Sequence, residues 1–400
     1  MTQILSIEPR PAAPASAFDL KPLLVANMLC TMAMMAFVPL VGPIARLLRM
    51  PAWQAGAAVT VGGVLWMLLA RRWGAASDRH GRRTVLLCGV GGFALCYAAM
   101  CALLVASIAL LPAALLVFAG LVLTRGAIGA FYAAIPSTGQ ALVADHVPPA
   151  GRARAMASLG AANAVGMVLG PALAALLAQR SLSLPLYVTA VLPLLALAVL
   201  WKALPRHGRQ GTRGASTLRL DDARLRRPMV VAFIAMFCVA ISQITVGFFA
   251  IDRLALAAGP AARAAGIALT AVGIGLIASQ MVVRRLDWPP QRLIRVGALI
   301  AACGFGATAL IATPVMLALC FFIAAAGMGC IFPAFAALAA NAVDAQSQGA
   351  AAGSVGAAQG LGIVLGPLAG ALLYDLGPGV PYAAVALLLV GVALWRSRAG

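Results

Sequence analysis

The stretch Ser158–Pro171, SLGAANAVGMVLGP, returns further along the chain as Ser354–Pro367, SVGAAQGLGIVLGP. The two copies align without a gap, are identical at nine of their 14 positions and lie 196 residues apart. The register continues beyond them, because Pro185 corresponds to Pro381 at the same separation. A long internal repeat of this kind is typical of membrane proteins that are built from two related halves.

The composition of the chain indicates an integral membrane protein. Of its 400 residues, 63% are hydrophobic and only 10% are charged, and the mean hydropathy is +1.00. A water-soluble fold could not bury that much apolar surface. About 20 apolar residues in a helix cross the hydrocarbon core of a bilayer. The apolar runs predict twelve such helices, at residues 23–46, 53–72, 84–106, 112–140, 151–178, 184–203, 228–251, 263–284, 293–312, 314–341, 349–374 and 380–396.

We therefore predict an all-α membrane protein with twelve transmembrane helices in two pseudo-symmetric six-helix bundles. We expect a disordered N-terminus over residues 1–20, an N-terminal bundle over 21–203, a linker over 204–227 and a C-terminal bundle over 228–400. The two copies of the repeat are six helices apart. An even number of crossings gives both halves the same orientation, so a substrate path is expected between them.

The net charge of +19 is distributed unevenly over the connections between the apolar runs. Arginine-rich connections, such as residues 71–83 and 202–227, alternate with connections that carry few or no arginines. This alternation follows the positive-inside rule, so we expect a multi-pass protein of a bacterial inner membrane with both termini and the linker in the cytoplasm. It also argues against a nucleic-acid partner.

The reactive side chains show no pattern of a metal site or an enzyme. All eight cysteines lie within apolar runs without a CxxC pair, and the three histidines lie in connections. No group of acids, histidines, cysteines and serines gathers at one depth of the membrane. We expect no cofactor, no metal and no catalytic residue, and we expect a monomer. The short connections also argue against a sensor.

Both copies of the repeat carry glycine at positions i and i+4, and a proline follows the second glycine. The glycine spacing lets a neighbouring helix backbone approach closely, and the proline removes an amide donor and favours a bend. We interpret this element as a bending seam between the halves, with ordinary helix packing as the alternative. Its residues are Gly166, Gly170, Pro171, Gly362, Gly366 and Pro367.

The connection between the second and third predicted helices reads GAASDRHGRR. A glycine turn here places one acid among several arginines at the membrane surface. A loop that merely obeys the positive-inside rule would explain neither the acid nor the glycine spacing. The residues concerned are Gly74, Asp78, Arg79, Gly81, Arg82 and Arg83.

This connection resembles the G-x-x-x-D-R-x-G-R-[RK] signature of the major facilitator superfamily. The Gly-Pro helix and the stretch Arg125–Gly129 resemble the fifth- and fourth-helix motifs of the drug:proton antiporter group in that superfamily, and the resemblance covers roughly residues 20–397. It implies alternating access by rocking of the two bundles, and proton antiport. It also implies a conformational latch, in which Asp78 meets the N-terminus of the eleventh helix, where a carboxylate is stabilised.

The chain departs from the pattern of the antiporter group in two respects. Ile128 and the pair Ala174-Ala175 differ from the residues of the fourth- and fifth-helix motifs, and no Asp or Glu lies in the middle of any predicted span. Asp252, at the end of the seventh helix, is the candidate proton carrier, with an ion pair to Arg253 or Arg46 as the alternative.

Arg125 is the one charge that we place near the middle of the membrane. A buried arginine is costly there, so it should face the interior or a wet cavity, with Tyr132 on the same helix face. It serves either in proton coupling or anion binding, or as a strut between helices. The polar residues Asn27, Asn163, Gln243 and Gln359 line a cavity or bridge helices in the same way.

These observations favour an exporter of small organic molecules, driven by the proton gradient. Two substrate classes remain open. An amphipathic drug fits the aromatic and methionine-rich helices, whereas an anionic metabolite, such as a carboxylate siderophore or another metal chelator, fits a cavity with one arginine. An importer of a small metabolite is the further alternative, because the motifs do not encode direction.

Overall fold

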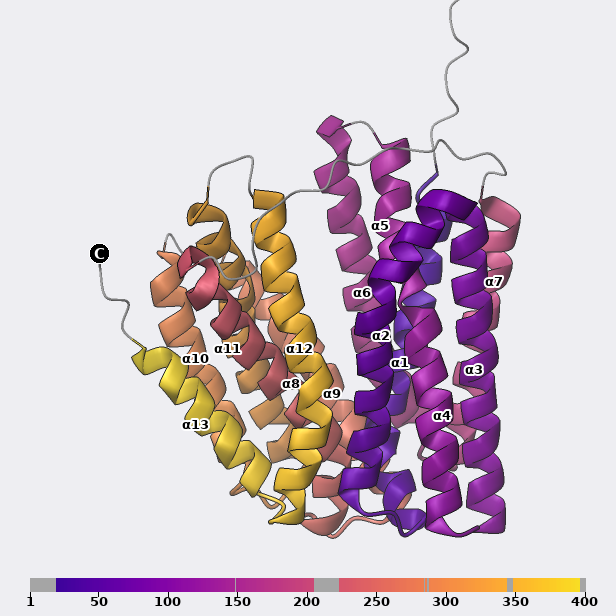
Figure 1. Cartoon of the computed structure of the whole chain (residues 1–400). Helices are drawn as coiled ribbons and strands as arrows, with labels where there is room; N and C mark the ends of the chain where they lie inside the picture. The colour runs from indigo at the N-terminus through magenta and orange to yellow at the C-terminus, as the bar shows by residue number, and fades with distance from the viewer. Residues whose placement is uncertain are drawn as a thin grey trace, which may run out of the picture.

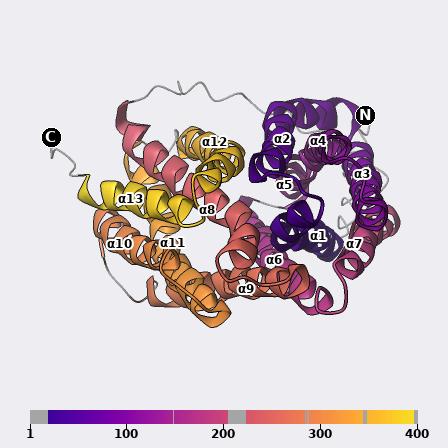
Figure 2. The ribbon, with the colours of Figure 1, turned by 90° about the horizontal axis from the view of Figure 1, so that it is seen from below.

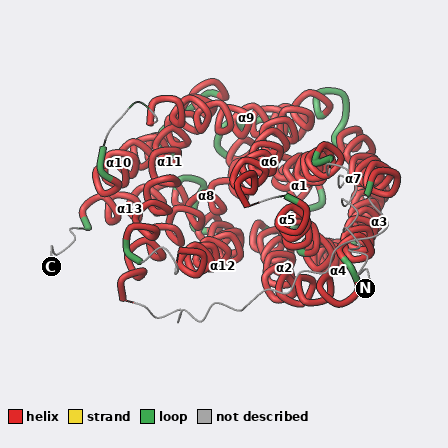
Figure 3. Tube along the Cα trace, turned by 90° about the horizontal axis from the view of Figure 1, so that it is seen from above, coloured by secondary structure: helices red, strands yellow, loops and turns green. Residues whose placement is uncertain are grey.

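The computed structural model describes residues 19–147, 149–204, 223–283, 285, 288–343 and 348–395. Every regular element in these ranges is a helix (Figure 3). Residues 1–18 of the expected disordered N-terminus (1–20) and residues 205–222 of the expected linker (204–227) lie outside the described residues.

The N-terminal half consists of seven helices. They are α1 (Lys21–Leu47), α2 (Ala52–His80), α3 (Arg82–Leu110), α4 (Ala114–Tyr132), α5 (Ala134–His146), α6 (Pro149–Leu177) and α7 (Ser183–Ala203). The C-terminal half begins with a short 3₁₀ turn, Ala223–Leu225. Its helices are α8 (Arg226–Asp252), α9 (Ala258–Val283), α10 (Pro290–Thr308), α11 (Pro314–Asn341), α12 (Gln348–Asp375) and α13 (Val380–Leu394).

The fold class predicted from the sequence is confirmed, with twelve transmembrane helices in two bundles. Helices α4 and α5 form one apolar span that is interrupted at Ala133. The interruption lies near Pro136, whose missing amide hydrogen cannot bond to the carbonyl of Tyr132 one turn earlier. In the part of the chain that the structure describes, ten spans are long and apolar enough to cross a membrane by themselves. α10, which begins with a basic turn, and α13, which has 15 residues, complete the set.

The second helix is longer than the sequence suggested. We expected it to end at residue 72 and a glycine turn to follow, but α2 continues through Gly74 and Asp78 to His80. Ser77 stabilises this last stretch, since its hydroxyl donates to the Gly74 carbonyl at 3.0 Å. The chain turns at Gly81, whose φ of +87° favours glycine.

The two halves lie side by side, with α1 and α8 as the most buried helices (Figure 2). Among the described residues, four helix pairs join the halves most closely, namely α1 with α8, α1 with α9, α2 with α12 and α6 with α9. The halves are close together at the end of the molecule that carries Arg46, here called the Arg46 end. They diverge toward the opposite end, here called the Asp78 end (Figure 1).

Small residues allow the close approach at the Arg46 end. A Cβ atom at Gly42 of α1 would overlap the backbone of Phe248 in α8, and one at Gly247 would lie 2.9 Å from the Pro43 ring. Glycine at both positions therefore lets α1 and α8 meet backbone to backbone, as in many membrane helix pairs.

Candidate substrate-binding site between the two halves

A cavity of about 260 Å³ lies between the halves, beside the middle of α1 and α8. Its wall is mostly apolar and comes from α1, α2 and α4 of the N-terminal half and from α8 and α12 of the C-terminal half. The apolar residues include Met34, Met35, Phe37, Val38, Val41, Val59, Trp66, Ile128, Ile244, Ile363 and Pro367. Three other lining residues have polar side chains, Arg125 and Tyr132 from α4 and Gln243 from α8. The indole N–H of Trp66 is a further donor, buried and without a partner among the described residues.

Arg125 is buried, with 7% of its surface exposed. Its Nη1 lies 3.9 Å from the Met34 sulfur, and its guanidinium carbon lies 5.3 Å from the centre of the Phe37 ring. Its Nε has no hydrogen-bond partner, and no Asp or Glu is found among the described residues that line the cavity. Among the described residues, the positive charge of this site is therefore stabilised by a soft sulfur and an aromatic ring.

Close packing between α2 and α4 fixes the position of this arginine. A Cβ atom at Gly62 of α2 would lie 2.7 Å from the Arg125 carbonyl oxygen, and one at Gly129 would overlap the Gly62 backbone. The two helices thus meet through glycine, which leaves the Arg125 side chain as the group that projects into the cavity.

A hydrogen-bond network lies on the N-terminal half beside the cavity. The Asn163 carbonyl oxygen accepts from the Asn27 amide at 2.9 Å and from the Thr31 hydroxyl at 2.7 Å. The Thr31 and Tyr132 hydroxyls are 3.3 Å apart, which connects the network to the cavity wall. Asn27 and Asn163 therefore link α1 to α6, and Tyr132 belongs both to this network and to the cavity. Thr31, which joins them, was not singled out from the sequence.

The two glutamines of the C-terminal half are placed differently from the asparagines. Gln243 lines the central cavity and also a neighbouring cavity of about 80 Å³ between α1, α6, α8 and α9. Gln359 lines a separate cavity of about 380 Å³ between α8, α11 and α12. Neither side chain has a hydrogen-bond partner among the described residues, so both amides are available to a ligand.

Asp252 lies at the Arg46 end rather than in the central cavity. Its Oδ2 accepts from Arg46 Nη2 at 2.6 Å and from the Tyr374 hydroxyl at 2.9 Å. The Arg46 guanidinium also lies over the Phe248 ring, 5.2 Å from its centre. Because Arg46 belongs to α1 and Asp252 to α8, this ion pair joins the two halves.

The signature residues lie at the Asp78 end. The Asp78 carboxylate pairs with Arg82 at 2.5 Å, and the buried Arg82 side chain also donates to Asp145 at 2.8 Å. Arg83 donates to the Trp201 carbonyl at 3.0 Å, and Arg79 is exposed. Asp145, which holds Arg82 from α5, was not singled out from the sequence. The contact of Asp78 with the start of the eleventh helix, α12, stays a prediction.

The Gly-Pro elements have two different neighbours. Cβ atoms at Gly166 and Gly170 would lie 2.7 and 2.5 Å from backbone oxygens of α1. Gly362 and Gly366 face α8 in the same way. These glycines therefore pack within each half, whereas the prolines that follow them face the other half.

The residues of α9 and α2 that pack against Pro171 and Pro367 form a second internal repeat, which was not predicted from the sequence. Gly266 of α9 faces the Pro171 carbonyl, and Gly56 of α2 faces the Pro367 carbonyl. Each glycine begins the pattern G-x-x-x-T-x-x-G, with threonine at 60 and 270 and the last glycine at 63 and 273. Glycines 63 and 273 in turn face Val364 and Val168, which are equivalent positions of the first repeat. Both copies are visible in the sequence.

Two related six-helix bundles around a central cavity are the architecture of a membrane transporter rather than an enzyme. The chain belongs to the Major Facilitator Superfamily, whose family model matches residues 23–353 and 232–399. It is 29% identical over 345 residues to the tetracycline resistance protein, class G, of Vibrio anguillarum, and the match covers 81% of each chain.

Solved transporter structures share the fold. A bacterial homologue of the human lysosomal transporter Spinster, in an inward-facing and unoccupied conformation, is 15% identical with a TM-score of 0.72, over 96% of this chain and 95% of that chain. The human organic anion transporter MFSD10 is 20% identical with a TM-score of 0.65, over 96% of this chain and 99% of that chain. A bacterial homologue of the iron transporter ferroportin, inward-facing, is 17% identical with a TM-score of 0.72, over 94% and 97%.

Proposed function

We propose that this transporter exports small amphipathic organic anions across a bacterial inner membrane by alternating access. The observation that carries the proposal is Arg125, a buried cation with an unpartnered Nε in an otherwise apolar cavity between the halves. A positive charge at the centre of a membrane costs about 2.5–3.5 kcal/mol on insertion scales. An anionic group beside Arg125 offsets that cost, whereas a cationic substrate would add to it.

The rest of the cavity fits the apolar part of such a substrate. Phe37, Trp66 and Ile363 offer aromatic and aliphatic surface, and the flexible Met34 and Met35 side chains adapt to different shapes. Gln243 supplies one hydrogen-bonding amide from the opposite half. A ligand held between Arg125 and Gln243 would contact both halves and could respond to their relative movement.

Export and the bacterial inner membrane are supported by the relative from Vibrio anguillarum, which is named as a tetracycline resistance protein. The organic anion transporter among the similar structures is consistent with the charge of the cavity. We place the Asp78 end in the cytoplasm, because the arginine-rich connections lie there. In the described conformation the halves then diverge toward the cytoplasm and are closed at the outer end.

We further propose that Asp252 couples export to protons. The Asp252 and Arg46 side chains are 27% and 35% exposed, so protons can reach the pair from the outer solution. Protonation neutralises the carboxylate and removes its attraction to Arg46. The link between α1 and α8 is weakened, which favours opening of the outer end. Coupling also requires that the proton leaves Asp252 toward the cytoplasm when the outer end closes again, because a proton that returned to the outer solution would not drive export.

Transport into liposomes with an imposed pH gradient tests the substrate class. The matched probes are a fluorescent amphipathic carboxylate and its neutral methyl ester, with a cationic dye and a carboxylate chelator as further probes. We expect accumulation of carboxylates only, and Arg125→Gln should abolish it while Arg49→Gln, an exposed charge at the Arg46 end, has no effect. Equal transport of the ester would overturn the anion proposal.

The same liposomes test proton coupling. Asp252→Asn should still exchange labelled for unlabelled carboxylate but should lose accumulation against a gradient. Accumulation at the wild-type level would remove Asp252 as the carrier. Direction is tested in whole cells, where an exporter lowers the internal amount of the probe and an importer raises it.

A further inference from the structure

The outer face of the C-terminal half carries a shallow, open apolar groove between α8 and α13. Its lining includes Ile234, Ala384, Leu387, Leu388, Gly391 and Trp395. The groove exists because α13 packs mainly on α10 and only lightly on α8. The equivalent helix of the other half, α7, packs closely on both α1 and α3. In Figure 1, α13 accordingly runs obliquely along the edge of its half.

The length of the groove matches one leaflet of a bilayer. The lining residues of α13 run from Ala384 to Trp395, which is about 16 Å at 1.5 Å per helical residue. The hydrocarbon core is about 30 Å thick, so each leaflet contributes about half of that. An acyl chain that begins beside Trp395 would therefore reach the middle of the membrane at the far end of the groove.

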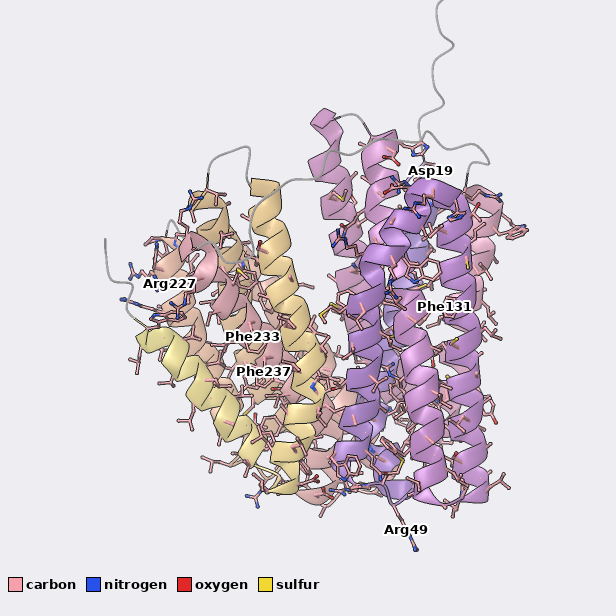
Figure 4. The ribbon with its side chains drawn as sticks, viewed as in Figure 1. Asp19, Arg49, Phe131, Arg227, Phe233 and Phe237 are labelled. Carbon is pink, nitrogen blue, oxygen red and sulfur yellow. The ribbon has the colours of Figure 1, made fainter. Side chains whose placement is uncertain are left out.

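Arginines surround the groove where it reaches the Asp78 end. Arg227, two helical turns before Ile234, donates from Nη2 to the Trp395 carbonyl at 3.3 Å, and its buried Nε has no hydrogen-bond partner. Arg295 of α10 lies close enough to Arg227 for the two charges to repel each other. Figure 4 shows Arg227 at this outer edge of the half.

The C-terminal half carries an excess of positive charge, with eleven arginines and four aspartates from residue 223 onward. Two of these aspartates, Asp252 and Asp375, terminate helices at the Arg46 end. In the other half, Arg83 of α3 likewise donates to a tryptophan carbonyl and has a buried Nε without a hydrogen-bond partner among the described residues. It differs in lying over the Trp201 ring, 5.8 Å from its centre, which stabilises its charge.

We propose that this groove is a binding site for an anionic phospholipid of the leaflet at the Asp78 end. One acyl chain lies along α13 from Trp395 toward Ala384, and the phosphate contacts Arg227 and Arg295. A phosphate diester accepts several hydrogen bonds from guanidinium groups and relieves the repulsion between them. A net negative headgroup is favoured over a zwitterionic one, because arginines outnumber aspartates by eleven to four in the C-terminal half from residue 223 onward.

The site is tested with purified full-length protein in detergent, to which phosphatidylglycerol or phosphatidylcholine is added. Native mass spectrometry counts retained lipids, and a titration gives the apparent affinity. We expect one phosphatidylglycerol to be retained with selectivity over phosphatidylcholine. Arg295→Gln and Arg227→Gln should each weaken its binding about fivefold, the contribution of one basic residue near an anionic lipid surface.

A second variant tests the acyl groove without removing a charge. A Cβ atom at Gly391 meets no neighbour within 4 Å, so Gly391→Leu begins its side chain in open space and extends it into the groove. It should lower phosphatidylglycerol retention at least fivefold. The matched control is Gly160→Leu in α6, where a Cβ atom also meets nothing within 4 Å. Arg49→Gln at the Arg46 end is the charge control, and both controls should bind as the wild type does.

Three results would overturn the proposal. Phosphatidylcholine could bind as tightly as phosphatidylglycerol, or Gly391→Leu could retain phosphatidylglycerol at the wild-type level. The third result is a dimer of the wild type that Gly391→Leu dissociates, because a second copy of the chain would then occupy the groove.

Discussion

The two halves pack their helices through the same glycine contacts but differ in the hydrogen bonds of their polar side chains. Asn163 and Gln359 are equivalent positions of the repeat, three residues before the first glycine of each Gly-Pro element. Asn163 is held by Asn27 and Thr31, whereas Gln359 faces a cavity without a partner among the described residues. The repeat thus conserves how the helices approach each other, while the polar chemistry has diverged.

The difference assigns separate roles to the halves. The N-terminal half presents a fixed polar surface, with the charge of Arg125 and the network that ends at Tyr132. The C-terminal half presents apolar walls and free amides such as Gln243. A symmetric scaffold permits rocking in either direction, and an asymmetric surface allows one half to recognise the charged part of a substrate.

The largest expected effect compares Arg125 with Gln243, the two polar groups on opposite walls of the cavity. Arg125→Gln removes a charge-assisted hydrogen bond and should weaken binding of an amphipathic carboxylate about tenfold to a hundredfold. Gln243→Leu removes a neutral one and should weaken binding about two- to tenfold. Isothermal titration of the detergent-solubilised protein measures both. Equal losses would contradict the division of roles between the halves.

The next largest effect concerns the glycine contacts between the halves, which both copies of the second repeat make. Gly56→Ala and Gly266→Ala each introduce a methyl group about 2.6 Å from an atom of the helix in the other half. Overpacking of this kind costs about 1–3 kcal/mol. It destabilises only the state in which the Arg46 end is closed, because the two helices are in contact in that state. Both variants should therefore shift the population toward states in which that end is open.

Hydrogen–deuterium exchange of α2 and α9 measures the shift in those populations. Because the two contacts are equivalent by the pseudo-symmetry, we expect exchange to rise by similar factors in both variants. Gly160→Ala serves as a control, since a Cβ atom there meets nothing within 4 Å. A rise in only one variant would show that one helix pair dominates closure.

The fold could be predicted from the sequence because its signals are long and redundant. Apolar runs, alternating arginines and the repeat all predict two bundles of six helices, and each of these signals is independent of the others. The end of α2 could not be predicted in this way. Its residues from Gly74 to His80 have the composition of a turn, and the helix is stabilised there by contacts such as the one between Asp78 and Arg82.

The site was predictable only in part, because its geometry depends on contacts between distant residues. A single arginine within an apolar run drew attention to Arg125. Asp145 is 63 residues from Arg82, and Thr31 is 132 residues from Asn163, so neither partner has a local sequence signal. The second repeat, with Gly56 and Gly266, has a spacing different from the first, because the C-terminal half is shorter between these helices.

A smaller effect separates the two repeat-equivalent amides. Asn163→Leu removes two hydrogen bonds from the interior of the N-terminal half and should destabilise it by about 1 kcal/mol, since such bonds average about 0.6 kcal/mol in membrane proteins. Gln359→Leu breaks no bond that is described and should leave stability unchanged. Thermal unfolding in detergent compares them. A larger loss for Gln359→Leu would indicate that its amide is also structural.

The smallest effect compares the threonines of the second repeat. The Thr60 hydroxyl oxygen accepts from the Leu368 amide of α12 at 3.1 Å, across the boundary between the halves. Thr270 instead donates to the Gly266 carbonyl of its own helix at 2.8 Å. Thr60→Val should therefore weaken closure of the Arg46 end by about 0.6 kcal/mol, and Thr270→Val should not. Hydrogen exchange at Leu368 reports the difference directly, and equal exchange in the two variants would mean that the bond between the halves contributes nothing to closure.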